Sequence, residues 1–206
     1  MLQQKELIME VLKDVPDESV LYLSVDTTNY YIAMLSTLEY LKNHLKMEGI
    51  YITSSRSVDS IISQLKIEKI DTHALFFVDS IAILSESKTN LPGVQVVESP
   101  AMLEAILLKV KWFLRKLKNE RRFIFVDSIN SLAVYNEPKL LCEFLHIFMN
   151  LMRARDIMTI LLSVDDQTPE AVKRVMRLSC DDFMEVKEEG VTLNGQLKTM
   201  LGEEAL

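Results

Sequence analysis

Two aspartates end short apolar stretches and are the side chains that the sequence places best for chemistry. Asp79 closes "LFFVD" and Asp127 closes "FIFVD", and a serine follows each of them. Open α/β sheets bind ligands at the carboxyl ends of their strands, where such carboxylates could hold a divalent cation. Aspartate and serine also end strands simply by accepting hydrogen bonds from the next turn. We favour this second interpretation and keep both aspartates as weak candidate metal ligands.

A third apolar stretch leads into the polar turn "SVDTTNYY", which could form a phosphate-binding loop. Such loops surround phosphates with glycine N–H groups at the start of a helix and contact them with a lysine. Residues 21–41 contain neither glycine nor lysine, and the chain has only 5 glycines. A phosphate here would have to rely on the N–H groups at the start of the next helix. The candidate positions are Ser24, Asp26, Thr27, Thr28, Asn29, Tyr30 and Tyr31.

Short apolar strands and longer helices alternate around these candidates. Most of the strands are nearly continuous apolar runs, as expected when helices cover both faces of a parallel sheet. The pattern predicts strands over 20–25, 49–53, 74–79, 122–127 and 157–164. It predicts helices over 30–47, 57–66, 99–119, 137–154 and 168–178.

This alternation predicts a three-layer α/β fold with a mostly parallel sheet. The tail "FMEVKEEGVTLNGQLKTML" predicts two or three short strands that turn at Gly190 and at "NG" and add an antiparallel edge hairpin. We expect one domain over residues 1–206, since the chain can bury one sizeable core and has no linker. Within it, 1–19 would form an N-terminal helix and lead-in, and 183–206 the edge strands and tail.

The predicted helix 137–154 is unusually apolar. Its apolar residues cover more than one face of a helix: Leu140, Leu141, Phe144, Leu145, Ile147, Phe148, Leu151 and Met152. We expect such a helix to be buried on most sides or to form a subunit contact.

Four segments, in this order, resemble the RecA/KaiC-like ATPase superfamily, and most of all its archaeal-type KaiC-related branch. Residues 20–41 resemble the strand and helix of the phosphate loop, and "GIYITSSRSVDSIISQL" (49–65) resembles the second strand. "RRFIFVDSINSLAVYNEPKLL" (121–141) resembles the Walker B strand, and "RARDIMTILLSVDD" (153–166) resembles the strand that ends near the γ-phosphate. The resemblance implies a RecA-like fold, with ATP bound between neighbouring subunits.

The phosphate loop departs from the family's Walker A pattern, G-x-x-x-x-G-K-[ST]. Asn29, Tyr30 and Tyr31 stand at the glycine, lysine and Ser/Thr places. Tyrosine adds bulk and no cation, and Asp26 adds a negative charge that repels a triphosphate. One such contact at about 4 Å is worth about 1–4 kcal/mol, depending on the local dielectric.

The catalytic positions depart from the family as well. Ser55 and Arg56 stand where the family has paired glutamates that activate water; serine has no basic group, and arginine stays protonated. Asp127 and Ser128 keep the Walker B position, where the carboxylate would hold Mg²⁺ through water. One carboxylate alone is not a phosphoryl-transfer site, so we expect neither ATP hydrolysis nor ATP-Mg²⁺ as a cofactor. Arg56 could meet an anion or stay solvated, but we expect it to pair with Asp127.

The segment "LLKVKWFLRKLKNERR" (107–122) carries seven basic residues. An apolar stripe at helical spacing predicts that one face belongs to the core, whereas two large apolar residues fall outside that stripe. The segment is either a solvated basic helix or a surface that docks a partner, since tryptophan and arginine favour interfaces. The candidate partner surface consists of Leu108, Lys109, Trp112, Arg115 and Lys116.

The net charge of −7 and the pI of about 5.1 argue against nucleic-acid binding by the surface as a whole. No apolar run has the length of a membrane span, and the charged start does not read as a signal peptide, so we expect a cytoplasmic protein. Together these observations predict a non-catalytic KaiC-like domain that acts as a regulatory or scaffold protein, with a protein partner or as a homo-oligomer. The alternatives are a nucleotide or anion sensor that binds without hydrolysis, and a metal-dependent phosphate-handling enzyme that uses Asp79 and Asp127.

Overall fold

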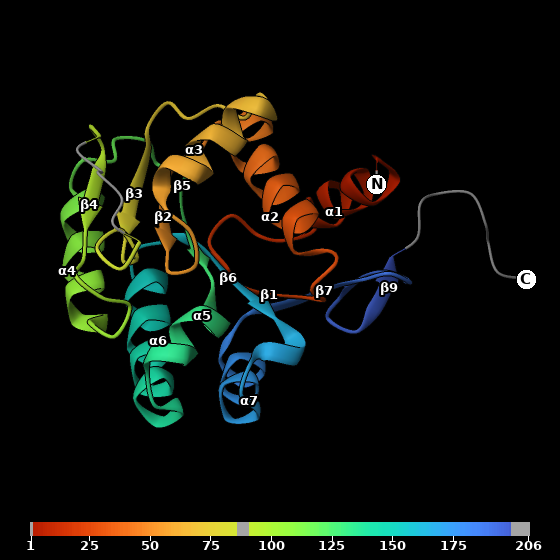
Figure 1. Ribbon diagram of the computed structural model, residues 1–206. Helices are drawn as coiled ribbons and strands as arrows, with labels where there is room; N and C mark the ends of the chain where they lie inside the picture. Colours follow the sequence, from red (N-terminus) through yellow and green to blue (C-terminus); the bar gives the residue numbers. More distant parts are fainter. Residues whose placement is uncertain (1, 86–90, 199–206) are drawn as a thin grey trace, which may run out of the picture.

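The computed structural model describes residues 2–85 and 91–198, which fold around one central sheet (Figure 1). The strands are β1 (Val20–Val25), β2 (Glu48–Thr53), β3 (Leu75–Asp79), β4 (Val94–Val96), β5 (Arg122–Asp127), β6 (Met158–Val164), β7 (Asp182–Lys187), β8 (Gly190–Leu193) and β9 (Gln196–Lys198). The helices are α1 (Leu2–Leu12), α2 (Tyr30–Glu39), α3 (Val58–Ile67), α4 (Leu103–Leu114), α5 (Ile129–Tyr135), α6 (Pro138–Arg153) and α7 (Glu170–Ser179). A π-helical turn, η1 (Tyr40–His44), and a 3-10 turn, η2 (Asp165–Gln167), complete the elements of the described ranges.

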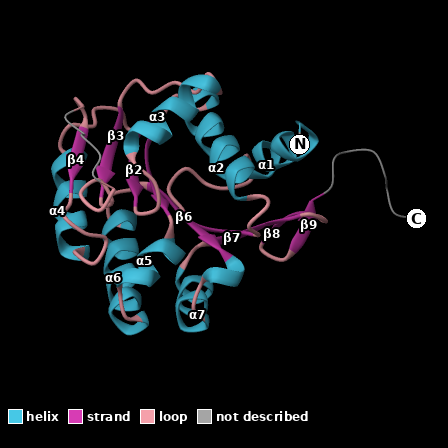
Figure 2. Cartoon of the chain, in the orientation of Figure 1, coloured by secondary structure: helices cyan, strands magenta, loops and turns pink. Residues whose placement is uncertain are grey.

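The strands lie in the order β4-β3-β2-β5-β6-β1-β7-β8-β9. All pairs from β4 to β7 are parallel, and β8 and β9 add an antiparallel edge after β7. Helices cover both faces of this sheet (Figure 2). The three-layer α/β architecture with an antiparallel C-terminal edge is therefore confirmed.

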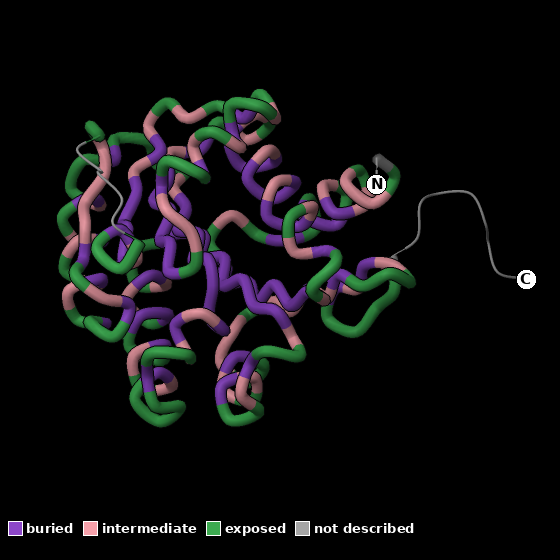
Figure 3. The backbone as a smooth tube through the Cα atoms, in the orientation of Figure 1, coloured by how far each residue is buried: buried purple, intermediate pink, exposed green. Residues whose placement is uncertain are grey.

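The core lies in two layers, one on each face of the sheet. Leu21 and Leu23 of β1 pack with α1, α2 and α3, whereas Val20 and Tyr22 pack with α4 to α7. Successive side chains of a strand point to opposite faces, so a strand that is apolar at every position can bury residues in both layers. The central strands are buried along their length (Figure 3), which explains why they were recognisable as continuous apolar runs.

The five predicted strands agree with the structure to within one residue at each end. The predicted turn at "NG" is also present, with positive φ angles of 52° at Asn194 and 80° at Gly195 between β8 and β9. The predicted tail beyond Lys198 lies outside the described residues. Two short elements were not predicted: β4 has three residues, and α5 has seven.

Two of the predicted helices are shorter in the structure, because side chains form hydrogen bonds with the backbone near their C-terminal ends. The helix predicted over 30–47 gives way at Tyr40 to η1, where the buried Lys42 amine donates to the carbonyls of Met47 and His73, at 2.8 and 2.7 Å. The helix predicted over 99–119 spans only α4. Its expected C-terminal end is non-helical, since the Glu48 carboxylate accepts the N–H groups of residues 118 and 119.

Helix α6 is not buried on most sides, so that part of the expectation was wrong. Leu140 and Ile147 are 53% and 58% exposed, although the opposite face of the helix packs into the core. Within the described ranges, no helix is long and apolar enough to cross a membrane.

Candidate functional site

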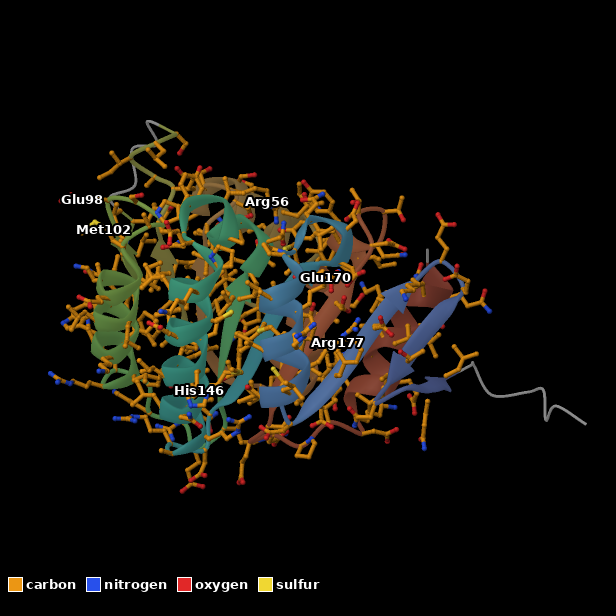
Figure 4. All side chains as sticks on the ribbon, turned by 90° about the horizontal axis from the view of Figure 1, so that it is seen from below. Arg56, Glu98, Met102, His146, Glu170 and Arg177 are labelled. Atoms are coloured by element: carbon orange, nitrogen blue, oxygen red, sulfur yellow. The ribbon has the colours of Figure 1, made fainter. Side chains whose placement is uncertain are left out.

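The carboxyl ends of β1, β2 and β5 converge on the candidate nucleotide positions. The loop after β1 carries 24–31, the loop after β2 carries Ser55 and Arg56, and β5 ends at Asp127. Figure 4 shows Arg56 at the same end of the molecule as Glu98 and Glu170, which also follow strands. The structure thus brings the predicted site residues to one edge of the sheet.

Asp127 is the centre of this site and is fully buried. The hydroxyls of Tyr30 and Tyr51 donate to its two carboxylate oxygens. Arg56 Nη2 lies 3.8 Å from Asp127 Oδ2, so the predicted ion pair is present. The peptide bond from Asp127 to Ser128 is cis. Three side chains therefore surround this carboxylate.

Tyr30 reaches Asp127 because α2 begins with it. Just before the helix, Asp26 Oδ1 accepts hydrogen bonds of 2.8 Å from Thr28 Oγ1 and from the Asn29 N–H, and its Oδ2 accepts one of 3.0 Å from Asn29 Nδ2. Burial alone would raise the pKa of Asp26, but these hydrogen bonds outweigh it and lower the pKa. Asp26 therefore stays ionised and orders the turn that places the first residue of α2.

Arg56 is held between aromatic rings. Its guanidinium carbon lies 4.9 Å from the centroid of the exposed Tyr31 ring and 5.8 Å from that of Tyr30, in cation–π range. Met34 Sδ lies 3.0 Å from Arg56 Nη2. The buried Nε of Arg56 has no hydrogen-bond partner in the part of the chain that the structure describes. This donor is shielded from solvent beside the site.

Burial governs protonation in this cluster. Burial and the neighbouring Asp127 carboxylate raise the pKa of both Tyr30 and Tyr51, so both hydroxyls keep their protons and donate. Burial also raises the pKa of Asp127, and the two tyrosine hydrogen bonds and Arg56 offset this only in part.

The raised pKa makes the contribution of Asp127 to stability depend on pH. Since the folded state holds this proton more tightly than the unfolded chain, the contribution is complete below the unfolded pKa of about 3.9 and declines as pH rises through the folded pKa. We expect the stability advantage of the natural protein over Asp127→Asn to shrink as pH rises above about 4. Urea unfolding of both proteins across this range measures it, and an advantage that grows with pH would contradict the assignment.

Asp79 does not join this site. Val58 N–H donates to its Oδ2 at 3.1 Å, and the N–H groups of Ile81 and Ala82 donate to its Oδ1 at 2.9 and 2.8 Å. This is the strand-ending role that we favoured from the sequence. Since β2 lies between the strands of Asp79 and Asp127, their backbones are about 9–10 Å apart. Within the described ranges, no group of three or more metal-ligating side chains occurs.

The site opens into two pockets. The smaller, of about 260 Å³, is lined by Thr27, Tyr30, Tyr31, Ser55, Arg56, Ser128, Asn130, Ser131, Val164 and Gln167. The larger, of about 480 Å³, is lined by Ser24, Val25, Asp26, Thr27, Thr28, Asp165, Asp166, Lys187, Glu188 and Glu189. The larger pocket has the size of a small-molecule site, but five carboxylates face one lysine in it. Its charge opposes a polyphosphate.

Sequence reasoning missed Tyr51 and the acidic residues of η2 and of the turn after β7. Tyr51 lies between Ile50 and Ile52 in the apolar centre of β2, and a buried tyrosine hydroxyl normally needs a partner. That rule could have identified it. The acids come from segments more than 100 residues from the loop that they face, and no local pattern joins these segments.

The candidate partner surface lies on α4, away from this site. Leu108 and Trp112 are 65% and 41% exposed, and Arg115 is also exposed. Lys116 Nζ lies 3.6 Å from the centroid of the Trp112 ring, and Trp112 packs edge-on against Phe113. The tryptophan is thus in contact with both neighbours and still partly exposed.

No known protein family and no curated protein matches the sequence. The structure is nevertheless similar to crystal structures of archaeal proteins at low sequence identity. The flagellar accessory protein FlaH from Methanocaldococcus jannaschii matches with a TM-score of 0.61 and 16% identity over 85% of this chain and 76% of that one. A KaiC-like protein from Pyrococcus horikoshii matches with a TM-score of 0.61 and 11% identity, over 92% and 84% of the two chains.

A third similar structure is an uncharacterised P. horikoshii protein in complex with an unknown peptide. It matches with a TM-score of 0.65 and 16% identity over 92% of this chain and 88% of that one. At these identities the similarity concerns the fold. The chain has the RecA-like α/β fold of KaiC-like and FlaH proteins.

Proposed function

We propose that this protein is a non-catalytic RecA-like domain that works in the cytoplasm by binding a protein partner, as a regulatory or scaffold subunit. The observation that carries the proposal is the closed environment of Asp127. Tyr30 and Tyr51 use both carboxylate oxygens, and Arg56 lies beside one of them. A water-bridged Mg²⁺ would have to displace these partners and bring its charge close to the guanidinium.

The phosphate loop supports the same proposal. Phosphoryl transfer depends on positioning and on cations around the phosphates. Among the described residues that line the smaller pocket, Arg56 is the one cation. It already faces Asp127 and two aromatic rings. The Tyr30 side chain fills the space beside Asp127, and the larger pocket is acidic. Neither pocket offers enough positive charge to neutralise a triphosphate.

The direct test is calorimetric titration of the protein with ATP-Mg²⁺, together with an assay for phosphate release. We expect a dissociation constant weaker than about 1 mM and no turnover above that of a matched Asp127→Asn preparation. Equal traces of activity in both preparations would identify a contaminant. Micromolar binding with turnover that Asp127→Asn abolishes would refute the proposal.

A similar structure supports the binding part of the proposal, since that P. horikoshii protein is in complex with a peptide. The exposed apolar residues of α4 and α6 offer surfaces for such a role. Light scattering of the purified chain distinguishes a homo-oligomer from a monomer that would bind a different protein.

One observation favours a second candidate, a sensor that binds a small anion without hydrolysis. The smaller pocket combines hydroxyl and amide side chains with a guanidinium whose Nε has no acceptor among the described residues. Saturable binding of inorganic phosphate that is lost in Arg56→Gln would favour the sensor. We do not propose a metal-dependent enzyme that uses Asp79, because three backbone N–H groups donate hydrogen bonds to that carboxylate.

A further inference from the structure

The strand β4 forms one outer edge of the sheet, beside α4 (Figure 1). It pairs with β3 on one side, and all three of its residues are partly exposed. An edge strand presents unpaired N–H and C=O groups that can pair with another chain. Proteins use such edges to bind extended peptides as an added strand.

The hydrogen bonds of β4 show which of its groups face outward. The Gly93 carbonyl accepts the Phe77 N–H at 2.9 Å, and the Val97 N–H donates to the Asp79 carbonyl at 2.8 Å. Bonding residues alternate along a parallel strand, so Val96, between these contacts, turns its own N–H and C=O away from β3. Among the described residues, neither group bonds to a backbone group outside the β3–β4 pair.

One side of α4 forms a wall along this edge. Lys109 and Trp112 are three residues apart and therefore share that side of the helix. Lys116 lies two residues past the end of α4, and its amine lies over the Trp112 ring. Lys109 Nζ donates to Gln95 Oε1 of β4 at 3.1 Å, which fixes the direction in which this side faces. Leu108 lies on the outer side of the helix instead, where it is more exposed than Trp112.

The wall is positively charged in a protein of net charge −7. Residues 108–118 contain five bases and no acid. The acid Glu98 lies with Met102 at the N-terminal end of α4 (Figure 4), whereas Trp112 and Lys116 belong to the C-terminal end of this helix and the turn after it. An acidic chain along β4 would thus meet positive charge beside the first half of the strand.

We propose that an extended acidic segment of a partner protein pairs with the outer edge of β4. Its carboxylates face Lys109 and Lys116, and one side chain packs on the exposed face of Trp112. The inference rests on the proposed function, since it names the partner chemistry and the surface. Because neighbouring residues of a strand point to opposite faces, the partner carries its acids at every second position.

Two synthetic peptides of equal composition test this pattern. GDVETEVDG places its acids on one face of a strand, whereas GVTVDEEDG groups them in sequence. Fluorescence anisotropy of labelled peptide measures binding, and the emission of Trp112, the one tryptophan of the chain, reports the location. We expect the alternating peptide to bind at least fivefold more tightly, with affinity falling as salt rises from about 50 to about 500 mM. Equal affinities would overturn the proposal.

Matched variants locate the contact on the protein. Trp112→Ala and the double variant Lys109→Gln/Lys116→Gln should each weaken binding of the alternating peptide at least fivefold. The controls are Leu108→Ala, which trims an exposed residue of the same helix, and Lys66→Gln/Lys139→Gln, which removes two charges elsewhere. Controls that weaken binding as much as the test variants would overturn the proposed surface.

Backbone pairing has its own test. Val96→Pro removes the outward N–H of β4, and proline is tolerated at this position of an edge strand. We expect at least a fivefold loss of binding with an unchanged circular dichroism spectrum. A second test leaves the protein unmutated and uses peptides that are N-methylated at one or the other alternating set of backbone amides. One set should abolish binding and the other should not, whereas equal effects of both sets would exclude strand pairing.

The remaining outcomes are also decisive. Tighter binding of a single-stranded oligonucleotide or of anionic lipid vesicles than of the alternating peptide would overturn the acidic-protein assignment. If the peptide fails while ATP-Mg²⁺ also fails to bind, the edge proposal falls and the non-catalytic function stands. If ATP-Mg²⁺ is hydrolysed while the peptide binds at the edge, the opposite holds.

Discussion

Replacing Asp127 with alanine is expected to lower the free energy of unfolding by about 3–5 kcal/mol, the cost of removing one partner from a buried charged cluster. The carboxylate accepts the hydroxyls of Tyr30 and Tyr51 and lies beside Arg56. In the variant, the fully buried Tyr51 hydroxyl keeps only Met34 Sδ, a weak acceptor at 3.2 Å. The guanidinium of Arg56 loses its carboxylate at the same time.

Urea unfolding with a check of the slope measures this loss. Asp127→Asn is the matched control, because it keeps the size of the side chain and one oxygen acceptor, and it should cost clearly less. Tyr51→Phe should cost about 1–3 kcal/mol, since it removes one donor from the buried carboxylate. A loss below about 1 kcal/mol in Asp127→Ala would show that the cluster does not stabilise the fold.

The sequence contained most of the information about the sheet. The strands β1 and β5 are buried on both faces, so their apolar runs have no gaps and their ends stand out. The strand β4 could not be found in this way, because three partly exposed residues carry no periodicity. It is a strand because it pairs with β3, and a local sequence pattern does not show that pairing.

The candidate site could be predicted where a single residue decides the chemistry. Arg56 and Asp127 follow neighbouring strands, and adjacent parallel strands bring their ends together. Their pairing was therefore accessible from the sequence. For Tyr30, the sequence showed that a bulky side chain stands in the phosphate loop. It did not show the hydrogen bond to Asp127, which depends on the turn that Asp26 orders.

Helix boundaries failed where tertiary contacts override local preference. The sequence continues to favour helix after Leu114, but the Glu48 carboxylate of a neighbouring strand binds the N–H groups of Lys118 and Asn119. Leu140 and Ile147 were expected either to be buried or to form a subunit contact, and within this chain they are exposed. Periodicity identifies the buried face of a helix, whereas it does not show what covers the others.

The second large effect is expected from Gly49→Ala in β2. A Cβ at this position would lie 2.2 Å from Phe123 Cζ and 2.3 Å from Phe123 Cε1. Phe123 is paired with Gly49 on β5 and is fully buried, so its ring has no free direction in which to move. Overpacking of a core typically costs about 1–3 kcal/mol and occasionally more, and this overlap predicts a loss of about 3 kcal/mol.

Thermal and urea unfolding measure the loss, and the double variant Gly49→Ala/Phe123→Leu shows its origin. Leucine shortens the side chain at the point of overlap, so the double variant should be more stable than the sum of the two single losses by about 1 kcal/mol or more. Strictly additive losses would mean that the glycine is required for its backbone and not for the space that it leaves. The contact also concerns the site, because Phe123 is the second residue of the strand that ends in Asp127. If the ring is forced out of place, β5 must shift against β2, and the ion pair between Asp127 and Arg56 should weaken with it.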